Sequence, residues 1–293
     1  MVTAVLAAAL GFAVLAAGST ANETRAVAPA GCVPLAPGNH RLAPIDGRVA
    51  VVVHVGATAK AGAPLVLALA GADQTGPAFA DYTGYSRLAD RNGFSVAYPT
   101  ASGARPFWNM SGTLPGKPDD VAYLRRVIAA TVTATCADPH RVGVTGVSNG
   151  GGMSAKLACD AADLIAAAAP VAGGYGSLPA CHPSRPVPIL EVHGVVDQVV
   201  PYNGKGASAY GAVSTFLAQW QRLDSCTGAV RSSTWRPNVL QLRWASCAGG
   251  TIVEHVRISD ADHGWPGEDD LTEHSEYAAT PRTWAFLSSF RTP

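Results

Sequence analysis

The sequence predicts an α/β fold with a mostly parallel central sheet and helices on both faces. Short apolar runs with strand character alternate with helical segments along the chain, which is the pattern of βαβ units. Several of these runs are continuously apolar, as strands buried on both faces of a sheet require. Hydrophobic residues make up 48% of the 293 residues and charged residues only 14%, so the chain can bury a substantial core.

The first part of the chain supplies three predicted strands. A lead-in rich in Pro and Gly occupies residues 28–46, and residues 49–55 form an apolar run with strand character. Residues 64–70 are continuously apolar and are expected to form a buried strand. A helix around residues 85–92 then leads to a strand over residues 94–98.

A long loop rich in Gly and Pro spans residues 100–118 and contains Trp108 and Asn109. Asp119 and Asp120 then begin a helix, because acidic residues suit the positive N-terminal end of a helix. Apolar residues mark the core-facing side of this helix: Val121, Leu124, Val127 and Ile128.

The second half of the chain continues the alternation. A strand over residues 141–146 is followed directly by a helix that ends near Cys159. No linker divides the pattern, so residues 28–293 are predicted to form one domain. The later segments are strands over residues 165–171, 188–193, 239–244 and 251–258, and helices over residues 213–223 and 282–290.

Residues 1–27 are predicted to be an export signal. Residues 5–17 form an apolar run of the length of a signal-peptide core, too short to span a membrane comfortably. No Lys or Arg precedes the run, and a buried or anchoring N-terminal helix is the alternative. We expect an extracellular protein. A lipid anchor on Cys32 at the cell envelope is a further alternative, although that cysteine lies far from the apolar run.

The cysteine count suggests disulfides, because an exported chain with an even number of cysteines usually pairs them. Cys226 and Cys247 bracket a short segment and are predicted to pair. Cys159 ends a helix and Cys181 follows the next strand, which makes a second pair plausible. Elimination leaves a pair between Cys32 and Cys136, and buried free thiols are the alternative to all three. The six cysteines are Cys32, Cys136, Cys159, Cys181, Cys226 and Cys247.

Charge and motifs exclude several classes of function. The 21 Lys and Arg residues balance the 21 Asp and Glu residues, and no basic stripe is present in the sequence, so nucleic acid is not expected as a partner. The sequence has no Cys-x-x-Cys pair of the metal-binding kind and no Gly-rich phosphate loop. We therefore expect a monomer without a cofactor, a metal or membrane attachment.

Residues 146–150 form the pentapeptide Gly-Val-Ser-Asn-Gly between a predicted strand and a predicted helix. In the nucleophile elbow of an α/β-hydrolase, the chain turns so sharply that a serine hydroxyl stands exposed above the sheet. Glycines flank the serine because a side chain there would collide with the neighbouring strand or helix. The motif predicts an α/β-hydrolase fold with Ser148 as nucleophile. A serine in an ordinary turn is the alternative.

The order of the later residues tests this prediction. Serine needs an adjacent base, usually a histidine that a carboxylate holds in the right tautomer. In α/β-hydrolases the acid follows the serine and the histidine comes last, each in a loop after a later strand. Asp197 follows the strand over residues 188–193, and His263 follows the strand over residues 251–258. Ser148, Asp197 and His263 are therefore the predicted catalytic triad.

Other acids and histidines compete with these residues. Asp260 and Asp262 lie too near His263 in sequence for the usual arrangement. Asp197 alone could also be a turn former. His193 is expected to be structural and to bond the backbone of a loop. The remaining histidines have no motif around them.

Two further groups complete the predicted site. An oxyanion hole needs two backbone N–H groups, one from Asn149 after the nucleophile and one from Gly71 or Ala72 after the strand over residues 64–70. Trp108 and Trp265 are candidates for the substrate pocket, and packing beneath the loops is the alternative for both.

With these residues in place, the chain resembles the extracellular polyhydroxybutyrate depolymerase and feruloyl esterase group of α/β-hydrolases, similar to carbohydrate esterase family 1. The resemblance runs from about Cys32 to the C-terminus. It is carried by residues 65–75, 108–109, 119–121, 138–151, 157–159, 169–173, 193–202 and 263–266.

The resemblance implies an esterase with Ser148 as nucleophile, Asp197 as acid and His263 as base. It also implies an ester substrate: a small ester, a polyhydroxyalkanoate or a plant cell-wall ester. One departure is that the group usually has His-Gly where this chain has Ala70-Gly71. We expect the backbone donor to survive and the enzyme to be weakened, not abolished.

Two other functions remain open from the sequence. A catalytically weak or inactive hydrolase fold could bind carbohydrate or cell wall, and Ala70 is its support. A peptidase on the same fold is the third possibility, although no lid or propeller segment supports it.

Overall fold

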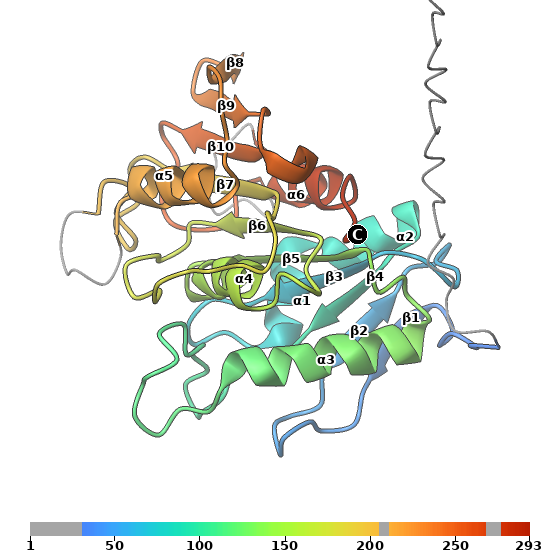
Figure 1. The fold of residues 1–293 in the computed structure, drawn as a ribbon. Coiled ribbons are helices and arrows are strands. Elements are labelled where there is room, and N and C mark those ends of the chain that lie inside the picture. The colour runs from blue at the N-terminus through green and yellow to red at the C-terminus, as the bar shows by residue number, and fades with distance from the viewer. Residues whose placement is uncertain (1–30, 205–210, 268–276) are drawn as a thin grey trace, which may run out of the picture.

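The computed structural model describes residues 31–204, 211–267 and 277–293. Within these residues the chain forms one ten-stranded sheet with helices on both faces (Figure 1). The predicted export signal, residues 1–27, lies outside the described residues. The predicted α/β fold is confirmed.

Six strands run parallel in the centre of the sheet, in the order β4, β3, β5, β6, β7 and β10. Antiparallel strands continue the sheet at each edge, β2 and β1 on one side and β9 and β8 on the other. The strands are β1 (Gly38–Arg41), β2 (Val52–Val55), β3 (Leu65–Leu69), β4 (Ser95–Tyr98), β5 (Val142–Val147), β6 (Ala167–Val171), β7 (Ile189–Gly194), β8 (Arg231–Arg236), β9 (Val239–Trp244) and β10 (Val253–Ile258).

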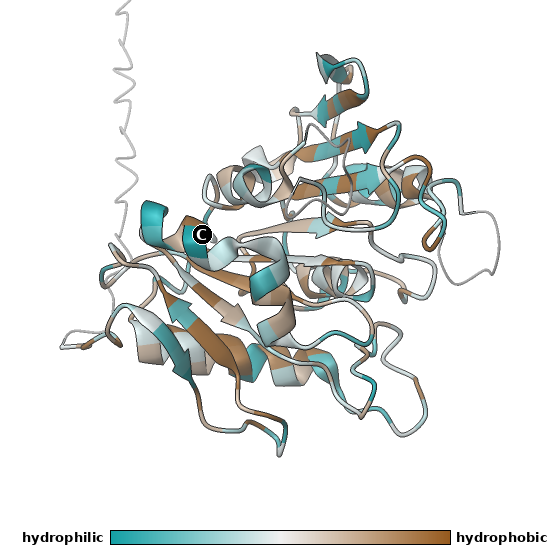
Figure 2. Ribbon diagram, turned by 180° about the vertical axis from the view of Figure 1, so that it is seen from behind, coloured by the Kyte–Doolittle hydropathy of each residue, from teal (hydrophilic) through white to brown (hydrophobic). Residues whose placement is uncertain are grey.

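Helices cover both faces of this sheet, as the opposite views of Figures 1 and 2 show. Helices α3, α4 and α5 lie on one face, and α1, α2 and α6 lie on the other. The helices are α1 (Gly76–Thr83), α2 (Tyr85–Asn92), α3 (Asp120–Thr135), α4 (Asn149–Asp160), α5 (Val213–Leu223) and α6 (Ala279–Leu287).

Strand β3 shows how the sheet divides two cores. Leu65, Leu67 and Leu69 point to the core under α3, α4 and α5, whereas Val66 and Ala68 belong to the core under α1, α2 and α6. Successive side chains of a strand point to opposite faces, so an all-apolar strand fills both cores at once. All five residues of β3 are at most 1% exposed.

Helix α3 begins as its sequence predicts. Asp119 is the N-cap, and its side chain accepts a hydrogen bond from the Ala122 N–H. Leu124, Val127 and Ile128 are buried on one face of the helix. The predicted core-facing side is therefore confirmed.

Three elements were not predicted from the sequence. β1 lies within the supposed lead-in and has no buried residue. α1 begins at an N-cap, Thr75, with a proline in its first turn, after a segment that was interpreted only as a loop. All six residues of β8 are exposed, so no apolar alternation marks this edge strand.

The closing helix α6 begins at Ala279, three residues earlier than predicted, because Pro281 is tolerated in a first turn.

The three predicted disulfides are confirmed: Cys32–Cys136, Cys159–Cys181 and Cys226–Cys247. The first joins the N-terminal segment to the residue that ends α3. A lipid anchor on Cys32 would need that sulfur free, but it is bonded to Cys136. The anchored alternative is therefore inconsistent with the structure.

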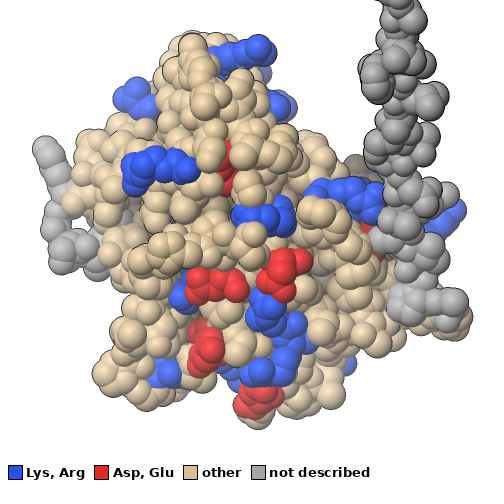
Figure 3. Space-filling view, viewed as in Figure 1, with Lys and Arg blue, Asp and Glu red and all other residues tan. Residues whose placement is uncertain are grey.

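Several charged side chains on the surface form ion pairs. Figure 3 shows acidic and basic side chains side by side over α3, where Arg125 bonds Asp163 and Arg126 bonds Asp46. Within the described residues, no helix is both long enough and apolar enough to cross a membrane.

The first disulfide should contribute most to stability, because it closes the longest loop. Cys32–Cys136 spans 104 residues and Cys226–Cys247 spans 21. In the chain-entropy model these loops correspond to about 4.7 and about 3 kcal/mol of stabilisation. We expect the free energy of unfolding in urea to fall more for the Cys32→Ser/Cys136→Ser double variant than for Cys226→Ser/Cys247→Ser. A loss of unfolding free energy in Cys32→Ser/Cys136→Ser that is equal to or smaller than the loss in Cys226→Ser/Cys247→Ser would contradict this expectation.

Candidate active site

Ser148 lies on the sharp turn between β5 and α4. Its backbone has φ 58° and ψ −122°, a left-handed conformation that L-residues adopt only under strain. Its N–H donates to the Val171 carbonyl at 3.0 Å, which fastens the turn to the end of β6. The side chain is part-exposed. This geometry is that of a nucleophile elbow.

The flanking glycines allow the turn to approach β3. A Cβ at Gly146 would lie 2.5 Å from the Leu69 carbonyl oxygen, and one at Gly150 would lie 2.1 Å from the same atom. Real side chains do not tolerate such contacts with backbone. The collision expected from the sequence is confirmed, and the neighbouring strand that causes it is β3.

Gly71 follows β3 and lies beside Ser148. A Cβ built on Gly71 would be 3.4 Å from the Ser148 Cβ. Leu69 pairs with Gly146 in the parallel register of β3 and β5, so both chains leave the sheet at the same edge. Gly71 is buried, whereas the adjacent Ala72 is exposed.

Asp197 and His263 also meet at this edge. They follow β7 and β10, which are parallel neighbours with Gly194 opposite Ile258. His263 Nδ1 lies 2.8 Å from Asp197 Oδ2. A carboxylate accepts only, so Nδ1 carries a proton, and in the tautomer that this bond selects Nε2 is the nitrogen able to accept one. The Asp197 side chain is fully buried, and that of His263 is 17% exposed.

The backbone holds the other oxygen of Asp197. Oδ1 accepts from the N–H groups of Val199 and Val200 at 2.9 and 2.7 Å. Burial favours the neutral acid, but hydrogen bonds from His193 and His263 outweigh it and hold the pKa of Asp197 well below its usual range. Asp197 is therefore an anion at neutral pH.

The competing acids do not contact the imidazole of His263. Asp262 Oδ1 accepts from the backbone N–H of His263 at 2.7 Å and from that of Gln198 at 2.9 Å, so it ties the two loops together. Asp260 accepts from the side chain of Asn238. The sequence argument against both acids agrees with these contacts.

Trp108 joins the two predicted sources of oxyanion N–H groups. Its indole N–H donates to the Ala70 carbonyl at 3.0 Å. Its backbone N–H donates to Asn149 Oδ1 at 2.6 Å, and its carbonyl accepts from Asn149 Nδ2 at 3.1 Å. We call Ala70, Trp108 and Asn149 the Trp108 clamp. The sequence marked Trp108 and Asn149 separately but gave no sign that they bond.

Trp265 fastens the loop that carries His263. Its backbone N–H donates to the Tyr82 hydroxyl at 2.9 Å, and its indole N–H donates to Thr280 Oγ1 at 2.8 Å. Trp108 is 0% and Trp265 1% exposed. Neither indole offers surface to a substrate, so packing beneath the loops, the alternative interpretation, describes both.

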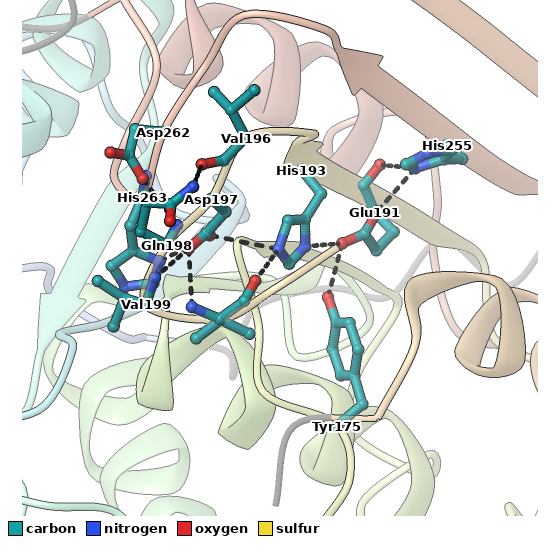
Figure 4. Close-up of polar contacts among 11 residues, drawn as sticks. Tyr175, Glu191, His193, Val196, Asp197, Gln198, Val199, His255, Asp262 and His263 are labelled. Atoms are coloured by element: carbon teal, nitrogen blue, oxygen red, sulfur yellow. Dashed lines mark hydrogen bonds and ion pairs between the residues drawn. The ribbon is translucent and has the colours of Figure 1, made fainter. Parts of the chain in front are cut away.

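A buried polar network extends from Asp197 away from His263 (Figure 4). His193 Nε2 lies 2.9 Å from the Val200 carbonyl, as expected for a histidine that bonds a loop. The same nitrogen lies 3.3 Å from Asp197 Oδ2, and Nδ1 lies 2.9 Å from Glu191 Oε1. Sequence reasoning missed Glu191, although a carboxylate within an otherwise apolar strand was a usable signal.

The structure brings a serine on a strained turn and a histidine bonded to a carboxylate to the same edge of the sheet. Among the described residues, no group of three or more His, Cys, Asp and Glu side chains is placed to hold a metal ion.

The family comparison agrees with this geometry. Residues 49–180 match the family model described as esterase PHB depolymerase. That range contains Gly71, Trp108 and Ser148, but not Asp197 or His263.

Curated relatives point the same way. Feruloyl esterase B of Piromyces equi is 35% identical over 173 residues, 53% of this chain and 31% of that protein. A bifunctional acetylxylan esterase/xylanase of Neocallimastix patriciarum is 28% identical over 78% of this chain and 31% of that protein. Poly(3-hydroxyalkanoate) depolymerase C of Paucimonas lemoignei is 32% identical over 44% of this chain and 32% of that protein. The chain spans about a third of the length of these relatives.

Solved structures support the fold. The acetyl xylan esterase from Aspergillus awamori aligns with a TM-score of 0.62 at 16% identity, over 77% of this chain and 94% of that one. A structure titled sOPH native aligns with a TM-score of 0.58 at 15% identity, over 92% of each chain. The chain thus has the α/β-hydrolase fold, and its resemblance to the polyhydroxybutyrate depolymerase and feruloyl esterase group is confirmed.

Proposed function

We propose that this protein is an exported serine esterase that hydrolyses carboxylic esters through an acyl-enzyme. Ser148 is the nucleophile, His263 the base and Asp197 the acid. The observation that carries the proposal is the 2.8 Å bond from His263 Nδ1 to Asp197, at the same sheet edge as a serine with φ 58°. The esterase relatives support the same reaction class.

The reaction follows from the protonation states. His263 Nε2 takes the proton of Ser148 Oγ as that oxygen attacks the ester carbonyl. The proton then passes to the leaving alkoxide, and an alcohol departs. Water, deprotonated by the same nitrogen, attacks the acyl-enzyme and releases the acid. Asp197 stabilises the imidazolium that forms in each half-reaction and remains an anion.

The oxyanion hole is built from the N–H of Asn149 and that of Gly71 or Ala72. The position of Gly71 beside Ser148 supports this assignment, because it brings the Gly71 backbone close to the proposed nucleophile. The Trp108 clamp links the chain segments of the two donors, since one residue bonds Ala70 through its indole N–H and Asn149 through its backbone N–H. The clamp does not depend on a histidine at position 70.

Three disulfides support export, because such crosslinks persist in oxidising compartments. The ester itself is proposed by class: a small ester, a plant cell-wall ester or a polyhydroxyalkanoate, as the relatives' names suggest. The preferred acyl group can be identified by comparing kcat/KM for four kinds of substrate: methyl ferulate, acetylated xylan, short acyl esters and hydroxybutyrate oligomers.

The inactive binding protein has lost its main support. It rested on Ala70, but the carbonyl of that residue keeps a 3.0 Å hydrogen bond from Trp108. The end of β3 is therefore held without a histidine at position 70, which favours the esterase over the binding protein.

Ser148→Ala should abolish esterase activity, because no other group can form the acyl-enzyme. We expect kcat/KM for p-nitrophenyl butyrate to fall by about 10⁴-fold or more. Ser289→Ala, at an exposed serine near the end of the chain, is the matched control and should retain wild-type turnover. Activity that persists in folded Ser148→Ala would sink the assignment.

Trp108→Phe tests the clamp, because it keeps an aromatic ring but removes the indole donor to Ala70. We expect kcat to fall about 10- to 100-fold with KM changed less than about threefold, since the hydrogen bonds to the oxyanion form in the transition state. Trp220→Phe, a buried tryptophan of α5, is the control for lost packing. Equal loss in both variants would contradict a specific role for Trp108.

A further inference from the structure

Both ring nitrogens of His193 face atoms that only accept hydrogen bonds. Nδ1 lies 2.9 Å from a Glu191 oxygen, and Nε2 lies 2.9 Å from the Val200 carbonyl oxygen and 3.3 Å from Asp197 Oδ2. A carbonyl donates nothing, and neither does a carboxylate, so each nitrogen needs its own proton. The hydrogen-bond geometry therefore makes His193 an imidazolium, held in the interior with its side chain 0% exposed.

Glu191 supplies the charge that makes this possible. Its carboxylate is fully buried and faces His193 through Oε1 and His255 Nδ1 through Oε2, at 2.9 and 2.7 Å. The Tyr175 hydroxyl donates to Oε1 at 3.0 Å. Burial opposes ionisation of Glu191, but the hydrogen bonds from His193 and His255 outweigh it and lower its pKa. Glu191 is thus an anion across the physiological range.

We propose that the Glu191-held imidazolium of His193 is a positioning residue for the Asp197–His263 pair, an inference that rests on the proposed esterase function. Its Nε2–H spans the Val200 carbonyl and Asp197 Oδ2, the same oxygen that accepts from His263 (Figure 4). It therefore fixes the loop between Asp197 and Val200 and the orientation of the carboxylate together.

The charge of His193 has a second consequence. An isolated Asp197 anion would favour the protonated, inactive form of the base His263. A cation on the opposite side of the carboxylate offsets part of that attraction.

The groups around His193 are consistent with a lasting charge. Burial opposes protonation, but hydrogen bonds to Asp197 and Glu191 outweigh it and raise the pKa of His193 to about 10. The Tyr202 ring meets the imidazole edge-on at 5.8 Å between centroids, and its hydroxyl bonds His255 Nε2. Arg257 lies over the Tyr202 ring, 6.0 Å from its centroid. Asp197 and Glu191 are the anions in direct contact.

Nitrogen-15 NMR of the histidine-labelled wild-type protein tests the charge without any assay of activity. At pH 8 we expect both ring nitrogens of His193 to be protonated, with a titration midpoint near pH 10. In Glu191→Gln the midpoint should fall by more than about one unit, because the neighbouring anion is gone. A wild-type His193 with one bare nitrogen at pH 8 would overturn the proposal.

His193→Gln tests the role in the reaction, because glutamine keeps an N–H donor but not the charge. We expect kcat for p-nitrophenyl butyrate to fall about tenfold or more, with KM changed less than about twofold. The acid limb of the kcat/KM profile should move up by about one pH unit, since the offsetting cation is lost. If the pH profile of kcat/KM for His193→Gln has the same shape as that of the wild type and differs only in height, the effect of the His193 charge is contradicted.

His54→Gln is the matched control. His54 is also buried and paired with a carboxylate, Asp90, at 2.9 Å, but it lies on β2, away from the site. The control should leave the pH profile in place, and a shift equal to that of His193→Gln would overturn the proposal. Wild-type protein without ester turnover would instead overturn the proposed function, while the NMR result on His193 would stand.

Discussion

The close approach of the elbow to β3 is the constraint on which the rest of the site depends. Gly146 and Gly150 bring the turn so near the Leu69 carbonyl oxygen that any side chain at either position would collide with it. That approach holds Ser148 at φ 58°, a conformation that costs about 1–3 kcal/mol and persists only where surrounding packing enforces it. It also brings Gly71 against the serine. The positions of the proposed nucleophile and the proposed oxyanion donors thus depend on one contact.

Parallel pairing positions the remaining groups. β7 and β10 are neighbours in register, so the loops after them emerge side by side and place Asp197 against His263. Gly194 at the end of β7 allows the chain around Ala261 to approach, because a Cβ there would lie 2.1 Å from the Ala261 carbonyl oxygen. Asp262 then bonds the backbone of both loops. Asp197 and His263, the proposed acid and base, are held by backbone geometry as well as by their own bond.

Much of this arrangement could be predicted from the sequence. The buried strands were evident because continuous apolar runs mark them, and the order of Ser148, Asp197 and His263 followed from the strand order. β8 could not be predicted, since all its residues are exposed and an edge strand needs no apolar pattern. The start of α6 was misjudged because its first turn contains a proline, which sequence rules treat as a helix breaker.

The polar contacts behind the site were least accessible from the sequence. Trp108 was a candidate for the substrate pocket with packing beneath the loops as the alternative, and its indole is buried and bonds Ala70. His193 was recognised as structural, but nothing in sequence spacing pairs it with Asp197 beyond the end of the strand. Side chains two residues apart on a strand share a face, so Glu191 and His193 could have been linked by that rule. The protonation of His193 needs the three-dimensional partners.

The most direct test of the central claim is covalent labelling with a fluorophosphonate, mapped by peptide mass spectrometry on the folded protein. The account predicts a single adduct on Ser148 and much slower labelling in Asp197→Asn, because the base loses the carboxylate that orients it. An unlabelled folded protein, or an adduct on another residue, would contradict it.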